Sequence, residues 1–173
     1  RPALSTRAAA AGTVGSPGMT EVPTSPVPRL RLVVVTCMDT RLDMRTLGLA
    51  PGDAHILRNA GGFVSTDILR SIAISQRFLQ TTRILLVAHT DCGAMKVDQA
   101  EFTSALAGET GEQPRWEVDL ASSAEEMFAT GTAAVAACPF LTYRTVETAL
   151  YDVHTQQVHY YDTPATSDEP GSA

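Results

Sequence analysis

The sequence predicts an α/β protein in which a mainly parallel central β-sheet is flanked by helices in three layers, with a C-terminal hairpin or edge strand. Two observations support this prediction. Residues 32–35 and 84–88 are short, uniformly apolar runs, as expected for strands that are buried on both faces. The predicted elements from residue 30 follow the order strand, helix, strand, helix, strand, which is typical of parallel α/β sheets.

The first half of the predicted domain alternates strands with helical segments. After the strand at residues 32–35, residues 43–47 predict a short helix, and a turn at Pro51–Gly52 leads into a second strand at residues 54–57. Thr66 can cap a longer helix that runs to about Leu79, because its apolar side chains recur mostly at spacings of three and four. The third strand follows directly.

The second half predicts two further helices and a hairpin. Residues 98–108 predict a short helix, and residues 109–118, which contain Gly and Pro, predict a surface loop. Ser122 or Ser123 opens the next helix, which Pro139 must end. The hairpin then offers an edge strand or a dimer contact. Its two predicted strands are residues 146–153 and 158–161.

The composition suits one domain between two tails. The chain has 173 residues, of which 44% are hydrophobic, and this length is too short for two full domains. Residues 1–28 are rich in Ala, Pro, Ser, Thr and Gly and predict a disordered or extended N-terminal tail. Residues 163–173 predict a polar C-terminal tail. The single folded domain is therefore placed at residues 29–162.

Charge and cysteine content argue against several classes of protein. A formal net charge of −6 disfavours a protein that grips nucleic acid, and the apolar runs are too short to cross a bilayer. Three cysteines without a CxxC pair disfavour a disulfide-stapled secreted domain and favour a reducing compartment. We therefore expect a cytoplasmic protein without nucleic-acid or membrane partners, with organellar targeting by residues 1–28 left open.

Three candidate ligand side chains lie at or near the carboxyl ends of predicted parallel strands. Cys37 follows the first strand and His89 ends the third, so both lie at the carboxyl ends of parallel strands. Cys92 comes three residues after His89, close enough for one loop to present both side chains to a single ion. Two thiolates and an imidazole suit tetrahedral Zn²⁺, and three protein ligands leave the fourth position open, as in catalytic zinc sites.

The motifs around these residues resemble those of a known family. They are Cys-Met-Asp-Thr-Arg at residues 37–41, Arg-Asn-Ala-Gly-Gly at residues 58–62 and His-Thr-Asp-Cys-Gly at residues 89–93. In order and type they resemble the CxDxR and HxxC motifs of the β-class carbonic anhydrases, from residue 30 to the C-terminal hairpin. The resemblance implies that Cys37, His89 and Cys92 bind zinc. It also implies that Asp39 either takes the fourth position, in a closed state, or swings away to pair with Arg41.

The chemistry of these residue types agrees with the implied roles. A zinc-bound water can have a pKa of about 7 instead of about 15.7, which supplies hydroxide at neutral pH. A guanidinium at Arg41 can hold Asp39 ionised through a bidentate pair, keep it off the metal and orient it to accept a proton. Glycines at Gly61, Gly62 and Gly93 would let the backbone approach closely and leave a small substrate pocket.

The resemblance implies an enzyme of the carbonate dehydratase type, a lyase. Its reaction would be the reversible hydration of carbon dioxide to bicarbonate and a proton by attack of zinc-bound hydroxide. The related carbonyl sulfide and carbon disulfide hydrolases share these motifs, so hydrolysis of those sulfur analogues stays an alternative. A third hypothesis is a non-catalytic zinc-binding protein in which Asp39 stays ligated. Homodimers or homotetramers are also implied, and the sequence leaves open the substrate preference, the oligomer size and the state of Asp39.

Several residues have more than one interpretation. Asp91 either orients one of the metal ligands without binding the metal itself, or is a loop carboxylate that faces solvent. Residues 1–28 contain too much Pro and Gly for the long helical arm of many β-class members, and Pro28 stands where plant-type members place a glutamine. The side chains expected to line a pocket or the core are Phe63, Met95 and Phe102, and Trp116 is a candidate dimer contact. The histidines expected to be structural or exposed are His55, His154 and His159, and Cys138 is expected to pack at the end of a helix.

Overall fold

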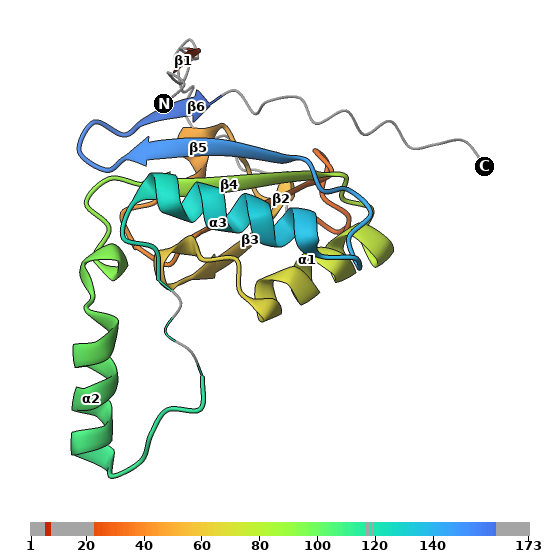
Figure 1. Cartoon of the computed structure of the whole chain (residues 1–173). Coiled ribbons are helices and arrows are strands. Elements are labelled where there is room, and N and C mark those ends of the chain that lie inside the picture. The colour runs from red at the N-terminus through yellow and green to blue at the C-terminus, as the bar shows by residue number, and fades with distance from the viewer. Residues whose placement is uncertain (1–5, 8–22, 117, 119, 162–173) are drawn as a thin grey trace.

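A six-stranded sheet forms the centre of the structure (Figure 1). The computed structural model describes residues 6–7, 23–116, 118 and 120–161. Strands β2, β3, β4 and β5 run parallel, whereas β6 pairs antiparallel with β5 and with β1. The predicted α/β class, with its mainly parallel sheet and C-terminal hairpin, is confirmed. The strands are β1 (Thr6–Arg7), β2 (Leu32–Cys37), β3 (Ala54–Asn59), β4 (Arg83–His89), β5 (Val146–Asp152) and β6 (Gln157–Tyr161), in the sheet order β1-β6-β5-β4-β2-β3.

Two short contacts tie part of the predicted N-terminal tail to the domain. Thr6–Arg7 form β1 against β6. The Pro26 carbonyl oxygen lies 2.9 Å from His55 Nε2. The remainder of the tail before residue 23, and residues 162–173, lie outside the described residues. The domain boundaries at residues 28 and 163 therefore stay predictions.

The helices begin at side-chain caps. Ser65, Asp98 and Ser123 each accept a hydrogen bond from the backbone N–H three residues later. The cap of α1 is thus one residue earlier than the predicted Thr66, while Ser123 caps α3 as expected. The helices are α1 (Thr66–Phe78), α2 (Gln99–Thr110) and α3 (Ala124–Ala137), with 3₁₀ turns η1 (Met44–Leu47), η2 (Ala60–Gly62) and η3 (Ala94–Lys96).

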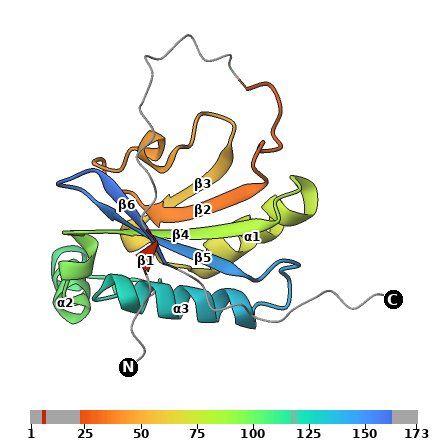
Figure 2. The same ribbon diagram turned by 90° about the horizontal axis from the view of Figure 1, so that it is seen from above.

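The two faces of the sheet are covered unequally. Helices α1 and α3 pack on one face, where they enclose alternate side chains of β2 and β4. Figure 2 shows α3 running along that side, close to β5. The other face is covered by residues 42–49, which include η1. Every residue of β2 is buried, as is every residue of β4 after Arg83, which explains the apolar runs at residues 32–35 and 84–88.

The strand order creates a crevice at the carboxyl edge of the sheet. The chain leaves β2 for β3 on one side, then crosses to β4 on the other side of β2. The ends of β2 and β4 therefore adjoin where the strand order reverses, which is the usual ligand position in open α/β sheets. Cys37 is the last residue of β2 and His89 is the last residue of β4.

Helix α2 projects away from the sheet (Figure 1). None of its residues is buried. Gln99 Nε2 donates to the Leu120 carbonyl, and Phe102 lies against Trp116 with 6.3 Å between ring centroids. Within the described residues, no helix has the length and apolar character needed to cross a bilayer.

Candidate metal centre

Cys37, His89 and Cys92 meet at the carboxyl edge of the sheet. Their ligand atoms all lie within 4.8 Å of one another, and all three residues are buried. Strands β2 and β4 supply Cys37 and His89, and the turn after β4 supplies Cys92. The structure therefore brings together the three side chains that the sequence pattern placed at one site.

The spacing of the two sulfurs fits a tetrahedral zinc ion. Two zinc–sulfur bonds of about 2.3 Å at a tetrahedral angle require sulfurs about 3.8 Å apart. Cys37 Sγ and Cys92 Sγ are separated by 3.8 Å. The donor set also fits, because thiolate and imidazole are the ligands that zinc prefers.

His89 presents a nitrogen that lacks a hydrogen-bond partner. Its Nδ1 lies 2.9 Å from the Thr90 carbonyl oxygen, so the Nδ1–H donates there and the lone pair is left on Nε2. Nε2 is buried and, within the described residues, makes no hydrogen bond. A buried nitrogen without a partner is costly, and a metal ion held jointly with the two sulfurs would satisfy it.

The surroundings of the Cys37 thiol favour its ionisation to a thiolate. Burial raises the pKa of Cys37, but its polar neighbours outweigh burial and bring the pKa to about 7. These neighbours are the His89 imidazole, the backbone N–H groups of Asp39 and Gly61, and the Cys92 thiol. Gly61 thus contributes through its backbone.

The Cys92 thiol will ionise beside the Cys37 thiolate only if a cation is close by. Burial raises the pKa of Cys92, and the neighbouring Cys37 thiolate raises it further. Two like charges this close disfavour each other unless a positive charge lies between them. A divalent ion would therefore allow both sulfurs to serve as thiolate ligands.

Asp39 lies beside the three ligands and is bound to Arg41. Its Oδ2 is 3.9 Å from His89 Nε2. The carboxylate accepts hydrogen bonds from Arg41 Nε at 3.0 Å, from Arg41 Nη2 at 2.8 Å and from the Arg41 backbone N–H at 2.9 Å. The Arg41 guanidinium holds the pKa of Asp39 far below its usual range. Asp39 is therefore ionised and paired with Arg41.

Two further charged residues, Asp91 and Arg58, contact this pair, and Lys96 contacts Asp91. Arg41 also donates to Asp91, which lies in the turn between the two ligands of the HxxC motif, and Lys96 binds the Asp91 carboxylate. Arg58 donates to the Cys37 carbonyl at 2.9 Å and to the Asp39 carbonyl at 2.5 Å. Neither Lys96 nor the Arg58 side chain had a role predicted from the sequence, because neither contact has a signature in residue spacing.

An apolar cavity of about 610 Å³ opens beside Cys37 and Asp39. Gly93 lines it, whereas Gly61 and Gly62 are buried and do not. Met95 packs against the core instead of lining the cavity. The apolar walls are Phe63, Val97, Phe102, Trp116, Val118 and Leu120.

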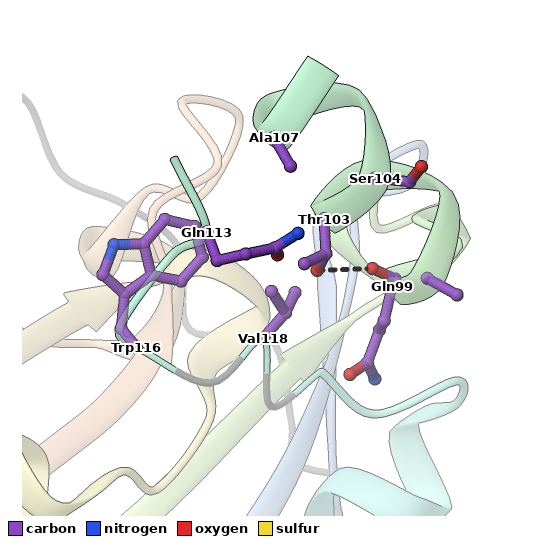
Figure 3. A pocket seen from close by; sticks show the side chains of 8 residues that line it. Gln99, Thr103, Ser104, Ala107, Gln113, Trp116 and Val118 are labelled. Atoms are coloured by element: carbon purple, nitrogen blue, oxygen red, sulfur yellow. Dashed lines mark hydrogen bonds between the residues drawn. The ribbon is translucent and has the colours of Figure 1, made fainter. Parts of the chain in front are cut away.

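A second hollow, of about 620 Å³, lies between α2 and the segment that follows it (Figure 3). Gln99, Thr103 and Ala107 on α2 face Gln113 and Trp116 across it. None of its lining residues titrates, so this hollow offers no acid, base or metal ligand. The candidate ligands and titratable groups described above therefore lie at the metal centre and not in this hollow.

Comparisons with known proteins agree with this site. A family model described as carbonic anhydrase matches residues 32–158. The β-carbonic anhydrase 1 of Mycobacterium tuberculosis is 39% identical over 134 residues, which span 76% of this chain and 82% of that protein. A carbon disulfide hydrolase of Acidianus sp. is 49% identical over 67 residues, which span 38% of this chain and 33% of that protein.

The fold agrees as well. A crystal structure of carbonic anhydrase from Streptococcus mutans superposes with a TM-score of 0.71 at 37% identity, and the match covers 84% of this chain and 88% of that one. The match of the family model and the extent of the similarity to β-carbonic anhydrase 1 confirm the predicted resemblance. The chain belongs to the β-carbonic anhydrase family of enzymes.

Proposed function

We propose that this protein is a zinc enzyme that catalyses the reversible hydration of carbon dioxide to bicarbonate and a proton. In this proposal Cys37, His89 and Cys92 hold the metal, and Asp39 and Arg41 act beside it. The observation that supports it most is the convergence of two sulfurs, at the separation zinc requires, with a buried imidazole nitrogen that makes no hydrogen bond within the described part of the chain.

Each residue of the site has a physical task in this proposal. A bound zinc ion would supply a Lewis acid that lowers the pKa of a water molecule to about 7. Asp39, kept ionised by Arg41, would accept a hydrogen bond from the attacking water and orient it. The apolar cavity beside Cys37 admits a small uncharged substrate and keeps bulk water away. The Gly61 backbone N–H stabilises the Cys37 thiolate, and Gly93 lines the cavity without a side chain that would fill it.

The sulfur analogues form the second candidate substrate class. The carbon disulfide hydrolase of Acidianus sp. shares 49% identity with part of this chain, and the cavity walls are apolar enough for carbon disulfide or carbonyl sulfide. However, that similarity covers only 33% of the hydrolase, whereas the similarity to β-carbonic anhydrase 1 covers 82% of that protein. Carbon dioxide is therefore the preferred proposal.

The test compares both substrate classes in one preparation. Stopped-flow carbon dioxide hydration is measured beside carbonyl sulfide and carbon disulfide consumption, with zinc content determined in parallel. The proposal expects one zinc per chain and a large preference for carbon dioxide. A preference for either sulfur compound would replace carbon dioxide as the substrate, and bound metal without turnover at any pH would indicate a non-catalytic zinc protein.

A matched pair of variants tests the role of Asp39. Asp39→Asn removes the charge next to the metal ligands and is expected to keep zinc but lose most activity. Asp43→Asn removes the same charge from a pair of similar geometry four residues away, outside the site, and is expected to leave activity unchanged. Equal activity in both variants would refute the role proposed for Asp39.

We also propose that the protein associates with itself. Helix α2 has no buried residue, and Phe102 and Trp116 are 40% and 57% exposed beside the metal-site cavity. An isolated helix of this length is marginal in water unless it packs against something. A second copy that covers α2 would bury this surface and narrow the mouth of the cavity.

A further inference from the structure

The chain contains two Asp-x-Arg units with nearly the same local geometry. In the first, Arg41 Nε lies 3.0 Å from Asp39 Oδ1 and Arg41 Nη2 lies 2.8 Å from Asp39 Oδ2. In the second, Arg45 Nε lies 3.0 Å from Asp43 Oδ1 and Arg45 Nη2 lies 2.6 Å from Asp43 Oδ2. The backbone N–H of each arginine also donates to its aspartate at 2.9 Å. The bidentate pair therefore forms locally, without help from the metal centre.

Among the residues that the structure describes, only the first unit contacts a second carboxylate. Arg41 Nη1 donates to Asp91 Oδ2 at 3.2 Å, and Arg41 Nη2 donates to the Asp91 backbone carbonyl at 3.0 Å. Within the described residues, Arg45 is paired with Asp43 alone. The side chain of Arg41 is 41% exposed and that of Arg45 is 77% exposed. The contact with Asp91 is therefore what distinguishes the site arginine from its neighbour.

The backbone at Asp91 is shaped for this contact. Its φ of +53° lies in the left-handed region, which is uncommon for a residue other than glycine and is tolerated best by Asn and Asp. In this conformation the carbonyl and the carboxylate of one residue both face the Arg41 guanidinium. Lys96 binds the other Asp91 oxygen. A strained conformation of this kind persists where the surrounding structure holds it.

We propose that Asp91 is a positioning residue that holds the Arg41 guanidinium beside the metal centre, independently of Asp39. This inference rests on the proposed function and on the closed state implied by the family resemblance, in which Asp39 leaves Arg41 to take the fourth position on the metal. Without Asp91, Arg41 would then lose its partner, and a long exposed side chain would regain its rotamer freedom. With Asp91, the guanidinium stays in place and Asp39 returns to a fixed partner.

The first measurement observes Arg41 directly and needs no catalysis. Side-chain guanidinium signals are recorded by ¹⁵N NMR in the metal-free and zinc-loaded protein and assigned through Arg41→Lys. We expect slow rotation of the Arg41 guanidinium in the wild type and faster rotation in Asp91→Asn and Asp91→Gly, both of which tolerate the left-handed φ. Arg45 is the internal control and is expected to be unchanged. Unaltered Arg41 signals in both Asp91 variants would overturn the proposal.

The second measurement is a double-mutant cycle on carbon dioxide hydration. If Asp91 acts through Arg41, Asp91→Asn lowers kcat about fivefold or more when Arg41 is present, and by no more than about twofold in the Arg41→Ala background. Equal losses in both backgrounds would mean that Asp91 acts independently, and would overturn the proposal. The absorption spectrum of the cobalt-substituted protein provides a readout apart from activity, since a misplaced Asp39 alters the coordination.

The two measurements separate failure of this inference from failure of the proposed function. If the wild type hydrates no carbon dioxide, the proposed function fails, and the NMR result alone decides the role of Asp91. Lys96→Met is the matched control for charge, because it removes a partner of Asp91 without touching Arg41. It is expected to leave Arg41 rotation slow, and a change as large as that in Asp91→Asn would assign the effect to general electrostatics instead.

Discussion

Gly62→Ala is expected to disturb the metal centre by displacing the backbone of β2, although it changes none of the side chains that face the centre. Gly62 has a φ of +69°, in the left-handed region. A β-carbon at this position would lie 3.0 Å from the Cys37 backbone nitrogen and 3.0 Å from the Thr36 carbonyl carbon. These atoms belong to β2, which is hydrogen-bonded to strands on both sides. The strand cannot yield as the end of a flexible side chain would.

A matched glycine separates the two costs. Gly48 has a φ of +74°, but a β-carbon there would meet no atom within 4 Å. Gly48→Ala therefore carries only the left-handed penalty, about 1–2 kcal/mol. Gly62→Ala carries that penalty together with overpacking, typically about 1–3 kcal/mol. We expect losses of unfolding free energy of about 2–5 kcal/mol for Gly62→Ala and about 1–2 kcal/mol for Gly48→Ala.

The assay is equilibrium unfolding in urea, with linear extrapolation to water, on metal-free wild type and both variants. Zinc affinity is measured by competition with a chelator. Because the clash falls on the residue that carries the first sulfur, Gly62→Ala is expected to bind zinc more weakly, whereas Gly48→Ala is expected to bind it like the wild type. If Gly62→Ala is no less stable than Gly48→Ala, the close approach of η2 to β2 does not constrain position 62 and the reasoning fails.

Three further predictions concern the ligands, acid stability and association. Cys37→Ser should lose zinc, as measured by metal analysis, while Cys138→Ser, away from the site, should retain it. Hydrogen bonds from Arg45 hold the pKa of Asp43 below its usual 3.8, so this pair stabilises the fold above about pH 4 and loses its effect as the pH falls further. The urea unfolding midpoints of the wild type and Asp43→Asn should therefore converge towards about pH 3. A difference between the two midpoints that stays constant with pH would contradict this prediction. Trp116→Ser should shift sedimentation towards a smaller species, and an unchanged distribution would place the interface elsewhere.

The sequence predicts much of this site because the sheet constrains it strongly. A strand buried on both faces has an unambiguous apolar pattern, and residues 32–35 and 84–88 have no polar interruption. Once both strands are parallel neighbours, their last residues must lie at the same edge. Cys37 and His89 could therefore be placed together from sequence, and the short loop to Cys92 left little freedom for the third side chain.

The contacts that the sequence did not predict involve loop geometry. Asp91 reaches Arg41 only because its backbone adopts a left-handed φ, and no residue pattern distinguishes that conformation from an ordinary turn. The cap of α1 was missed by one residue because Ser65, Thr66 and Asp67 are all competent caps. Likewise, the pattern of residues 98–108 predicted a helix, but not that α2 would bury none of its residues.

Comparison of the two Asp-x-Arg units shows which feature of the CxDxR motif distinguishes Asp39 from Asp43. Both units form the same bidentate pair with the same backbone hydrogen bond, so the local chemistry of Asp and Arg does not distinguish them. Asp39 differs from Asp43 because it lies two residues after the end of β2, where its carboxylate comes within 3.9 Å of His89. Its distance from the end of the strand, marked in the sequence by Cys37, therefore places a common type of surface ion pair beside the candidate metal centre.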